Sequence, residues 1–199
     1  WWIEYSRIDG IRQDTHPYAD YDFMSTWCKE VENEYPDFNI VGEAWYPRGT
    51  ASAWWQRDSK MNESNSNLKT VMDFDLTFTC QKAFGDVCSS NEGSEAGLFK
   101  IYEVIAQDFL FPDPNNVLIF LDNHDLGRFM QKGESDLRRY KQAIAFLLTT
   151  RGIPQIYYGT EILMSGTKAE GDGVIRTDFP GGWAGDPKDA FTPEGRTDL

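Results

Sequence analysis

The chain has 199 residues, 40% of them hydrophobic and 26% charged, which is typical of a globular domain with room for a sizeable core. A formal net charge of −13 argues against a nucleic-acid partner, because few cations remain to neutralise a run of phosphates. No apolar stretch approaches the roughly 20 residues that span a bilayer, so we expect no membrane insertion.

The first third of the chain predicts two strands separated by a helix. Residues 10–14 form a short β-like run, and a helical pattern covers about 20–34, with Asp20 or Asp22 as its N-cap. One face of that helix carries Phe23, Met24, Trp27, Cys28 and Val31. An apolar strand is expected at 39–43, and a polar loop rich in Asn, Ser and Trp over roughly 45–67.

The rest of the chain repeats this alternation. We expect strands at 69–74, 117–122 and 154–158, and helices near 78–84, 98–109 and 136–150. The apolar residues of the second of these helices are Leu98, Ile101, Tyr102, Ile105 and Phe109. The last forty residues are rich in glycine and read as a long loop.

Strands that alternate with helices predict right-handed βαβ units and a parallel sheet covered on both faces. Five such strands fit either a doubly wound sheet or part of a (β/α)₈ TIM barrel. The glycine fingerprint of a dinucleotide-binding fold does not follow any of the strands, which weakens the doubly wound alternative.

Carboxylates stand where three of the predicted strands end: Asp14, Glu43 and the pair Asp122 and Asp125. Each alone is readily explained as a helix cap or turn residue. In a parallel α/β fold, however, the carboxyl ends of the strands open onto one shared face where ligands bind. Three converging positions therefore indicate a site.

The chemistry that requires this arrangement is glycoside hydrolysis, in which one carboxylate stays ionised and another stays protonated. Arg12 lies two residues before Asp14 on the same strand, so both side chains point to one side and the cation favours an ionised Asp14. Glu43 follows an apolar strand and precedes Trp45, our candidate sugar-binding aromatic, and such a site raises a carboxyl pKa. Asn123 and His124, directly before Asp125, suit sugar hydroxyls.

Four segments resemble the α-amylase family of glycoside hydrolases. Residues 10–14 (GIRQD), 41–45 (VGEAW) and 120–125 (FLDNHD) are similar to three of its characteristic regions, and 152–161 (GIPQIYYGTE) is similar to a fourth, on the family's last barrel strand. Their order and spacing also match. Within the family the chain most resembles neopullulanase and cyclomaltodextrinase-like α-glucan hydrolases. Residues 178–183 (DFPGGW) add to this resemblance.

The resemblance implies Asp14 as the nucleophile, Glu43 as the general acid/base and Asp125 as the third carboxylate, which steadies the distorted sugar. It implies further that Arg12 and His124 bind around the sugar at the cleavage point, with Arg128 as a helper. The reaction would proceed with retention through a covalent glycosyl intermediate, with the two catalytic carboxyls about 5–5.5 Å apart.

The chain also departs from the family. A Lys-His pair often follows the nucleophile, but Pro17 and Tyr18 stand here, so the acceptor side of the cleft differs. We expect the remaining histidine, His16, to be a hydrogen-bonded loop residue. With two histidines and no cysteine cluster, no catalytic metal is expected. The chemistry requires no cofactor, and the resemblance allows a structural calcium ion in the full-length protein.

Several other residues have a structural and a functional interpretation. Trp54 and Trp55 fit either sugar platforms or a small core beneath a long loop. For Tyr157 and Tyr158 we favour barrel packing, and for Asp73 and Asp75 we favour turn capping.

By the resemblance, residues 1–199 form a partial catalytic domain, the C-terminal part of a (β/α)₈ barrel. They would hold about the fourth to eighth strands, without the N-terminal strands or any inserted or C-terminal domain. A complete barrel needs about 250 residues. We therefore expect this chain alone to be catalytically weak or inactive.

The expected activity is retaining hydrolysis of α-1,4-linked glucans such as starch, maltooligosaccharides, cyclodextrin or pullulan. Two alternatives stay open. One is an α-glucan transglycosylase, in which a sugar hydroxyl replaces water, and the other is a non-catalytic relative that binds glycans or scaffolds a partner. A polymeric substrate favours a periplasmic or secreted protein. The sequence does not indicate an oligomeric state.

Overall fold

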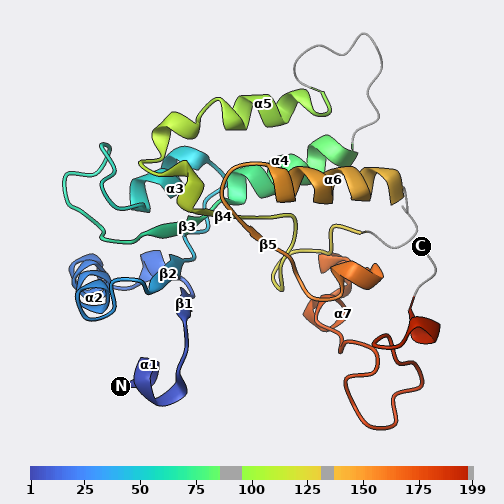
Figure 1. The fold of residues 1–199 in the computed structure, drawn as a ribbon. Coiled ribbons are helices and arrows are strands. Elements are labelled where there is room, and N and C mark those ends of the chain that lie inside the picture. Colours follow the sequence, from blue (N-terminus) through green and yellow to red (C-terminus); the bar gives the residue numbers. More distant parts are fainter. Residues whose placement is uncertain (86–95, 131–136, 197–199) are drawn as a thin grey trace. The chain divides into compact units, whose positions relative to one another are not determined.

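The computed structural model describes residues 1–85, 96–130 and 137–196, and its centre is a five-stranded sheet (Figure 1). The strands are β1 (Gly10–Gln13), β2 (Asn39–Gly42), β3 (Thr70–Met72), β4 (Val117–Phe120) and β5 (Ile153–Gln155). They lie in the order β1-β2-β3-β4-β5, and the pairs β1–β2, β2–β3 and β3–β4 are parallel.

The order of the strands in the sheet is also their order in the chain. A doubly wound sheet reverses its strand order at a switch point, whereas a barrel adds each strand beside the previous one. The five described strands contain no such reversal. The sheet is therefore part of a (β/α)₈ barrel, a choice that the sequence pattern had left open.

Seven α-helices accompany the described strands: α1 (Trp2–Ser6), α2 (Tyr21–Glu34), α3 (Gly49–Trp55), α4 (Phe74–Gly85), α5 (Phe99–Ile105), α6 (Leu137–Thr149) and α7 (Asp172–Ile175). Helix α3 lies within the segment 45–67 that was expected to be a loop, because its Gly-Thr-Ala-Ser start carries no apolar periodicity. The last part of the chain is mostly irregular, as expected, with α7 and short 3₁₀ turns.

Side-chain caps fix where two of the helices begin. Asp20 caps α2, because its carboxylate accepts a hydrogen bond from the Phe23 amide at 2.9 Å. Asp73 similarly accepts from the Leu76 amide at 2.9 Å, so α4 begins at Phe74 and not near residue 78. Asp73 is thus a cap, as the sequence suggested.

The chain divides into two compact units, one formed by Trp1–Phe120 and Leu147–Pro154, the other by Leu121–Phe146 and Gln155–Leu199. In the first unit, side chains from α2, β2, α3, β3 and β4 form one buried apolar cluster. Arg151 lies 2.9 Å from the buried carboxylate of Asp73 and also pairs with Asp108. These ion pairs hold the start of α4 to residues far along the chain.

Two of the predicted apolar faces are less buried than expected. In α2, Met24 and Cys28 are buried and Trp27 and Val31 half-buried, but Phe23, one residue off that stripe, is 64% exposed. In the segment expected as a helix over 98–109, α5 ends at Ile105 and only Ile101 is fully buried. Helix α5 contacts α4 on one side; Phe99 and Tyr102 are exposed, and Val104 and Ile105 are half-buried. Among the described residues, no helix is long and apolar enough to cross a membrane.

Candidate active site

The first carboxylate cluster forms where β1 and β2 end. Gln13 pairs with Gly42 in the parallel register, and the Glu43 amide donates to the Gln13 carbonyl at 2.9 Å, which extends the ladder by one residue. Asp14 and Glu43 are therefore the residues that leave two neighbouring strands at the same edge of the sheet. The sequence prediction of a shared edge is confirmed for this pair.

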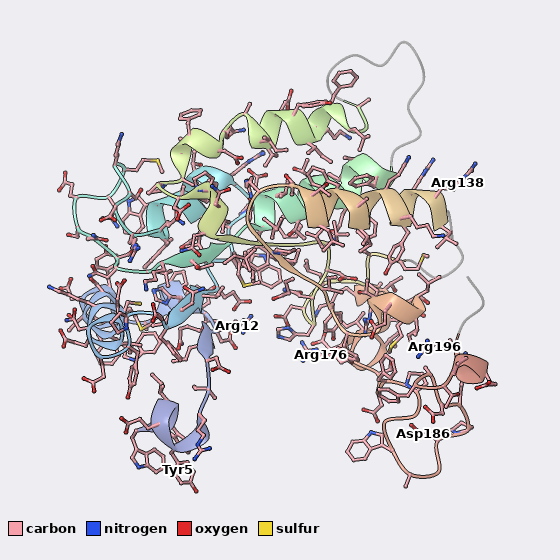
Figure 2. The ribbon with its side chains drawn as sticks, in the orientation of Figure 1. Tyr5, Arg12, Arg138, Arg176, Asp186 and Arg196 are labelled. Carbon is pink, nitrogen blue, oxygen red and sulfur yellow. The ribbon has the colours of Figure 1, made fainter. Side chains whose placement is uncertain are left out.

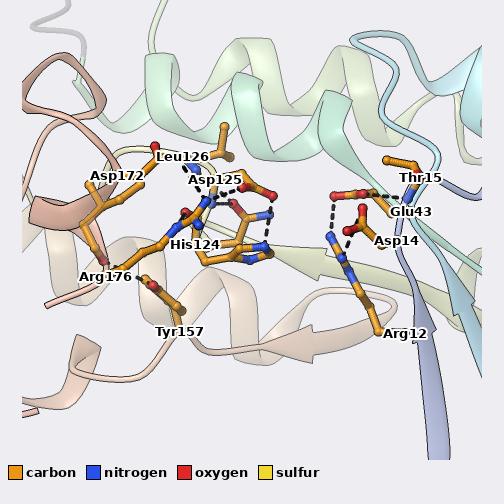
Figure 3. Close-up of polar contacts among 12 residues, drawn as sticks. Arg12, Asp14, Thr15, Glu43, His124, Asp125, Leu126, Tyr157, Asp172 and Arg176 are labelled. Carbon is orange, nitrogen blue, oxygen red and sulfur yellow. Dashed lines mark hydrogen bonds and ion pairs between the residues drawn. The ribbon is translucent and has the colours of Figure 1, made fainter. Parts of the chain in front are cut away.

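Arg12 contacts both of these carboxylates (Figure 3). One guanidinium nitrogen donates to Glu43 Oε1, and the other lies 3.5 Å from Asp14 Oδ1. The sequence placed Arg12 beside Asp14 on the same strand. Its closer partner is in fact Glu43, because the register brings β2 beside β1 at this level.

Glu43 and Asp14 have different environments. The Asp14 side chain is 69% exposed, whereas that of Glu43 is 4% exposed. Burial raises the pKa of Glu43, and the nearby Asp14 carboxyl raises it further, while the Thr15 amide, which donates to Glu43 Oε2 at 3.0 Å, and the charge of Arg12 offset part of that rise. The net direction favours a protonated Glu43, as a general acid requires.

A small open pocket of about 100 Å³ lies beside Glu43. Its other lining residues are Thr15, Pro17, Tyr18, Trp45 and Tyr46. The Trp45 ring, 39% exposed, stacks on the buried Phe74 ring with centroids 4.4 Å apart and 20° between planes. One face of the indole is thus backed by the core, so the ring is held as a fixed apolar wall.

Two sequence expectations near this pocket have clear outcomes. His16 is 1% exposed, and neither ring nitrogen has a hydrogen-bond partner among the described residues. The prediction that His16 is a hydrogen-bonded loop residue is therefore wrong. Its ring instead packs edge-on against Trp55, with centroids 5.7 Å apart. Trp54 and Trp55 contact each other and Tyr21 beneath the loop, so the small-core interpretation holds for them.

The second carboxylate cluster surrounds Asp125, in the other unit (Figure 3). One Asp125 oxygen lies 3.1 Å from His124 Nε2, and the other lies 2.7 Å from a guanidinium nitrogen of Arg176. Arg176 also donates to the His124 carbonyl at 2.7 Å, and it lies 3.4 Å from Asp172 of α7. Asp125 is thus held by a cation from the late part of the chain, where Figure 2 labels Arg176.

Two further residues predicted at the site are buried in that unit. The Asn123 side-chain oxygen accepts from the amides of Asp125 and Leu126 at 2.9 and 3.0 Å, so Asn123 shapes the turn that presents Asp125. Arg128 is 1% exposed; it donates to the Tyr158 carbonyl and stacks over the Tyr157 ring at 4.1 Å. Tyr157 and Tyr158 therefore pack, as favoured from the sequence.

Asp122, which precedes this turn, is also buried. Its carboxylate accepts a hydrogen bond from the Phe129 amide at 2.7 Å. Burial raises the pKa of Asp122 to about 6, although this hydrogen bond and the charge of Arg128 act in the opposite direction. Asp122 is thus a structural carboxyl beneath the Asp125 turn.

Arg176 is a contact that sequence reasoning missed. It lies in a glycine-rich segment with no periodicity, and nothing near it in the sequence marks a partner 51 residues away. Among the described residues no group of three His, Cys, Asp or Glu side chains could hold a metal ion.

The chain is similar to known proteins over most of its length. The family model "Alpha amylase, catalytic domain" matches residues 2–188. The chain is 32% identical to a cyclomaltodextrin glucanotransferase of Thermoanaerobacterium thermosulfurigenes over 89% of its length, and 34% identical to an α-amylase of Niallia circulans over 83%. It spans only 23% and 29% of those two relatives.

A solved structure gives the same result for the fold. The crystal structure of an α-amylase from Geobacillus thermoleovorans, complexed with acarbose, superposes with a TM-score of 0.73 at 29% identity. The match covers 90% of this chain and 38% of that one.

Proposed function

The chain belongs to the α-amylase family of catalytic domains, and from that premise we propose that it carries the catalytic carboxylates of a retaining α-glucan hydrolase. Asp14 is the nucleophile, Glu43 the general acid/base and Asp125 the third carboxylate. Arg12, His124, Asn123, Trp45 and Arg128 form or support the sugar-binding surface. The substrates are α-1,4-linked glucans.

In the proposed reaction an Asp14 oxygen attacks the anomeric carbon while Glu43 gives its proton to the departing glycosidic oxygen. The C–O bond to the leaving sugar breaks, and an ester bond to Asp14 forms. Glu43, now ionised, then takes a proton from water, whose oxygen displaces Asp14 at the anomeric carbon. Two inversions give net retention, and both carboxyls return to their starting states.

The observation that carries this proposal is the difference between two carboxyls that share Arg12. Asp14 is mostly exposed, as an ionised nucleophile can be, whereas the buried Glu43 has a raised pKa. That pairing of environments is what a retaining glycosidase needs. A separation of about 5–5.5 Å between the carboxyls stays part of the prediction.

The test is a proton NMR time course with maltoheptaose on the complete protein, beside a Glu43→Gln variant. We expect α-anomeric product first, and a loss of about 10²- to 10⁴-fold in the variant, which lacks the transferable proton. Glu30→Gln, the same change on the exposed face of α2, is the matched control and should leave turnover unchanged. Product that first appears as the β-anomer would contradict the mechanism.

Transfer to a sugar acceptor is the second candidate activity. The glucanotransferase names among the relatives favour it, and so does the aromatic pocket beside Glu43, where Tyr18 and Trp45 can receive a sugar ring. Product analysis at rising maltoheptaose concentration separates the two activities, since a transferase makes chains longer than maltoheptaose without increasing the number of reducing ends, whereas each hydrolysis adds one. Sugar binding without any product would instead favour a non-catalytic relative.

The activity expected of the isolated 199-residue chain depends on how many barrel strands it supplies. Its described part supplies five strands, whereas a TIM barrel closes with eight. An open sheet leaves two unpaired edges. We therefore expect the isolated chain to turn over maltoheptaose weakly or not at all, and full activity from it as a monomer would contradict that expectation.

A further inference from the structure

The turn after β1 has a strained residue that contacts the general acid/base. Thr15 has φ 49° and ψ 37°, the left-handed conformation, which a β-branched residue rarely adopts. In that conformation its amide donates to Glu43 Oε2 at 3.0 Å, and its carbonyl accepts from the Tyr18 amide at 2.9 Å. Such strain persists only where neighbouring contacts enforce it.

The next residue, His16, supplies those contacts. Its buried ring meets the Trp55 ring at an interplanar angle of 86°. It also lies against Gly42, the residue directly before Glu43, where an added Cβ would come within 3.1 Å of His16 Cγ. Pro17 follows, and its fixed φ restricts the backbone conformations that the turn can adopt.

Leaving both imidazole nitrogens buried without a partner is unfavourable compared with an apolar side chain of similar size. Burial lowers the pKa of His16 to about 4, so the ring is neutral at the pH of any ordinary assay. Its contribution to the site is therefore through packing and not through charge.

We propose that His16 is a positioning residue: packed against Trp55 and Gly42, it holds Thr15 in the left-handed conformation so that the Thr15 amide binds Glu43 Oε2. This inference rests on the proposed role of Glu43 as acid/base. The amide stabilises the ionised carboxylate and fixes which oxygen faces away from Arg12. The titratable groups beside Glu43 are Asp14 and Arg12, both from the β1 segment, and neither is altered by a change at His16.

The sign of the effect follows from the direction of the hydrogen bond. Losing a donor to the ionised form raises the pKa of Glu43, so the basic limb of the kcat/KM profile, which reports the protonated acid, moves to higher pH. For His16→Ala we expect an upward shift of about one pH unit, the size of one lost hydrogen bond to a charged group. A purely structural role would lower activity without moving the limb.

The matched variants are His16→Leu, Thr15→Gly and the double variant His16→Ala/Thr15→Gly. Leu fills the site without polar atoms, so the limb should stay in place. Glycine adopts positive φ without strain, so Thr15→Gly alone should also leave the limb unmoved. In the double variant the limb should return at least halfway from its position in His16→Ala to its wild-type position. A carbon-13 NMR titration of the Glu43 carboxyl on the complete protein gives the same pKa without turnover.

The outcomes separate this inference from the proposed function. An unmoved limb in folded His16→Ala, a shift in His16→Leu, or no recovery in the double variant would each overturn the inference. If His16→Ala does not fold, His16→Leu and Thr15→Gly decide, because both must keep the wild-type Glu43 titration. Full activity in Glu43→Gln would overturn the proposed function instead, whatever the titration shows.

Discussion

The cluster around Glu43 and the cluster around Asp125 both pair carboxylates with an arginine, but they do so in different settings. In the first, Arg12 projects from a strand, and two carboxylates with very different exposure, 69% and 4%, share it. In the second, Arg176 directly follows α7, and the Asp125 side chain it contacts is 27% exposed. A strand fixes the first cation, whereas the end of a short helix fixes the second.

The two settings differ in how strongly an arginine acts on the carboxylate beside it. Coulombic interactions grow as water is excluded, so Arg12 acts on Glu43 at low effective dielectric. Arg176 and Asp125 remain partly in solvent, where ion pairs contribute little to stability. We therefore expect changes in the first cluster to have larger effects than equivalent changes in the second.

The largest effect should follow Arg12→Ala. Without the cation the negative charge of Asp14 loses its compensating partner and Glu43 loses a donor, so we expect kcat/KM on maltoheptaose to fall on the order of 100- to 1,000-fold. Arg176→Ala is the matched change in the other cluster and should cost less than about tenfold, because Asp125 keeps its contact with His124. Equal losses of kcat/KM in the two variants would show that the first cluster is no more sensitive than the second.

A smaller effect is expected in stability, from His16 in the first unit. Its pKa is about 4 in the folded chain against 6.5 in the unfolded one, so the unfolded chain binds more protons between those values. The free energy of unfolding should therefore fall by about 2 kcal/mol between pH 7 and pH 5 through this residue. Urea unfolding of His16→Leu at both pH values should lack that part of the loss. A variant with the wild-type pH dependence would show that His16 is not buried as described.

The smallest effect has the opposite sign and belongs to Asp122 in the second unit. Its pKa is about 6 in the folded chain and 3.8 in the unfolded one, so the folded chain binds more protons in that interval. This unit should gain about 1 kcal/mol between pH 7 and pH 5. Asp122→Asn keeps an oxygen for the Phe129 amide and removes the titration, so amide hydrogen exchange in this unit should lose its pH-dependent protection. A protection factor that still rises at pH 5 in the variant, after correction for the intrinsic pH dependence of amide exchange, would contradict the assignment.

The parts of the fold that could be read from the sequence are those governed by local pattern. The apolar runs ending on Glu43 and Asp122 marked β2 and β4, because a buried parallel strand needs continuous apolar residues. The short β-like run ending on Asp14 marked β1, although that strand is only partly buried. The Asp20 cap placed the start of α2 for the same local reason. The strand order could not be read, since it depends on which strands pair and not on any one of them.

The rest depended on contacts between distant residues. Helix α3 is held by burial of Ala53 and Trp55, not by a periodic pattern, so its sequence looked like loop. His16 looked like a polar loop residue because nothing beside it in sequence reveals Trp55 or Gly42. Arg176 could not be paired with Asp125 for the same reason.

The strand order has a consequence for how the chain acquires its structure during synthesis. Each of β2, β3 and β4 pairs with the strand that left the ribosome just before it, so a partner is already present whenever a new strand emerges. The entropy lost on closing each connection is then that of one or two helices and their loops, not of the whole chain. Assembly can proceed from the amino end in step with translation, and each new strand covers the growing edge of the sheet.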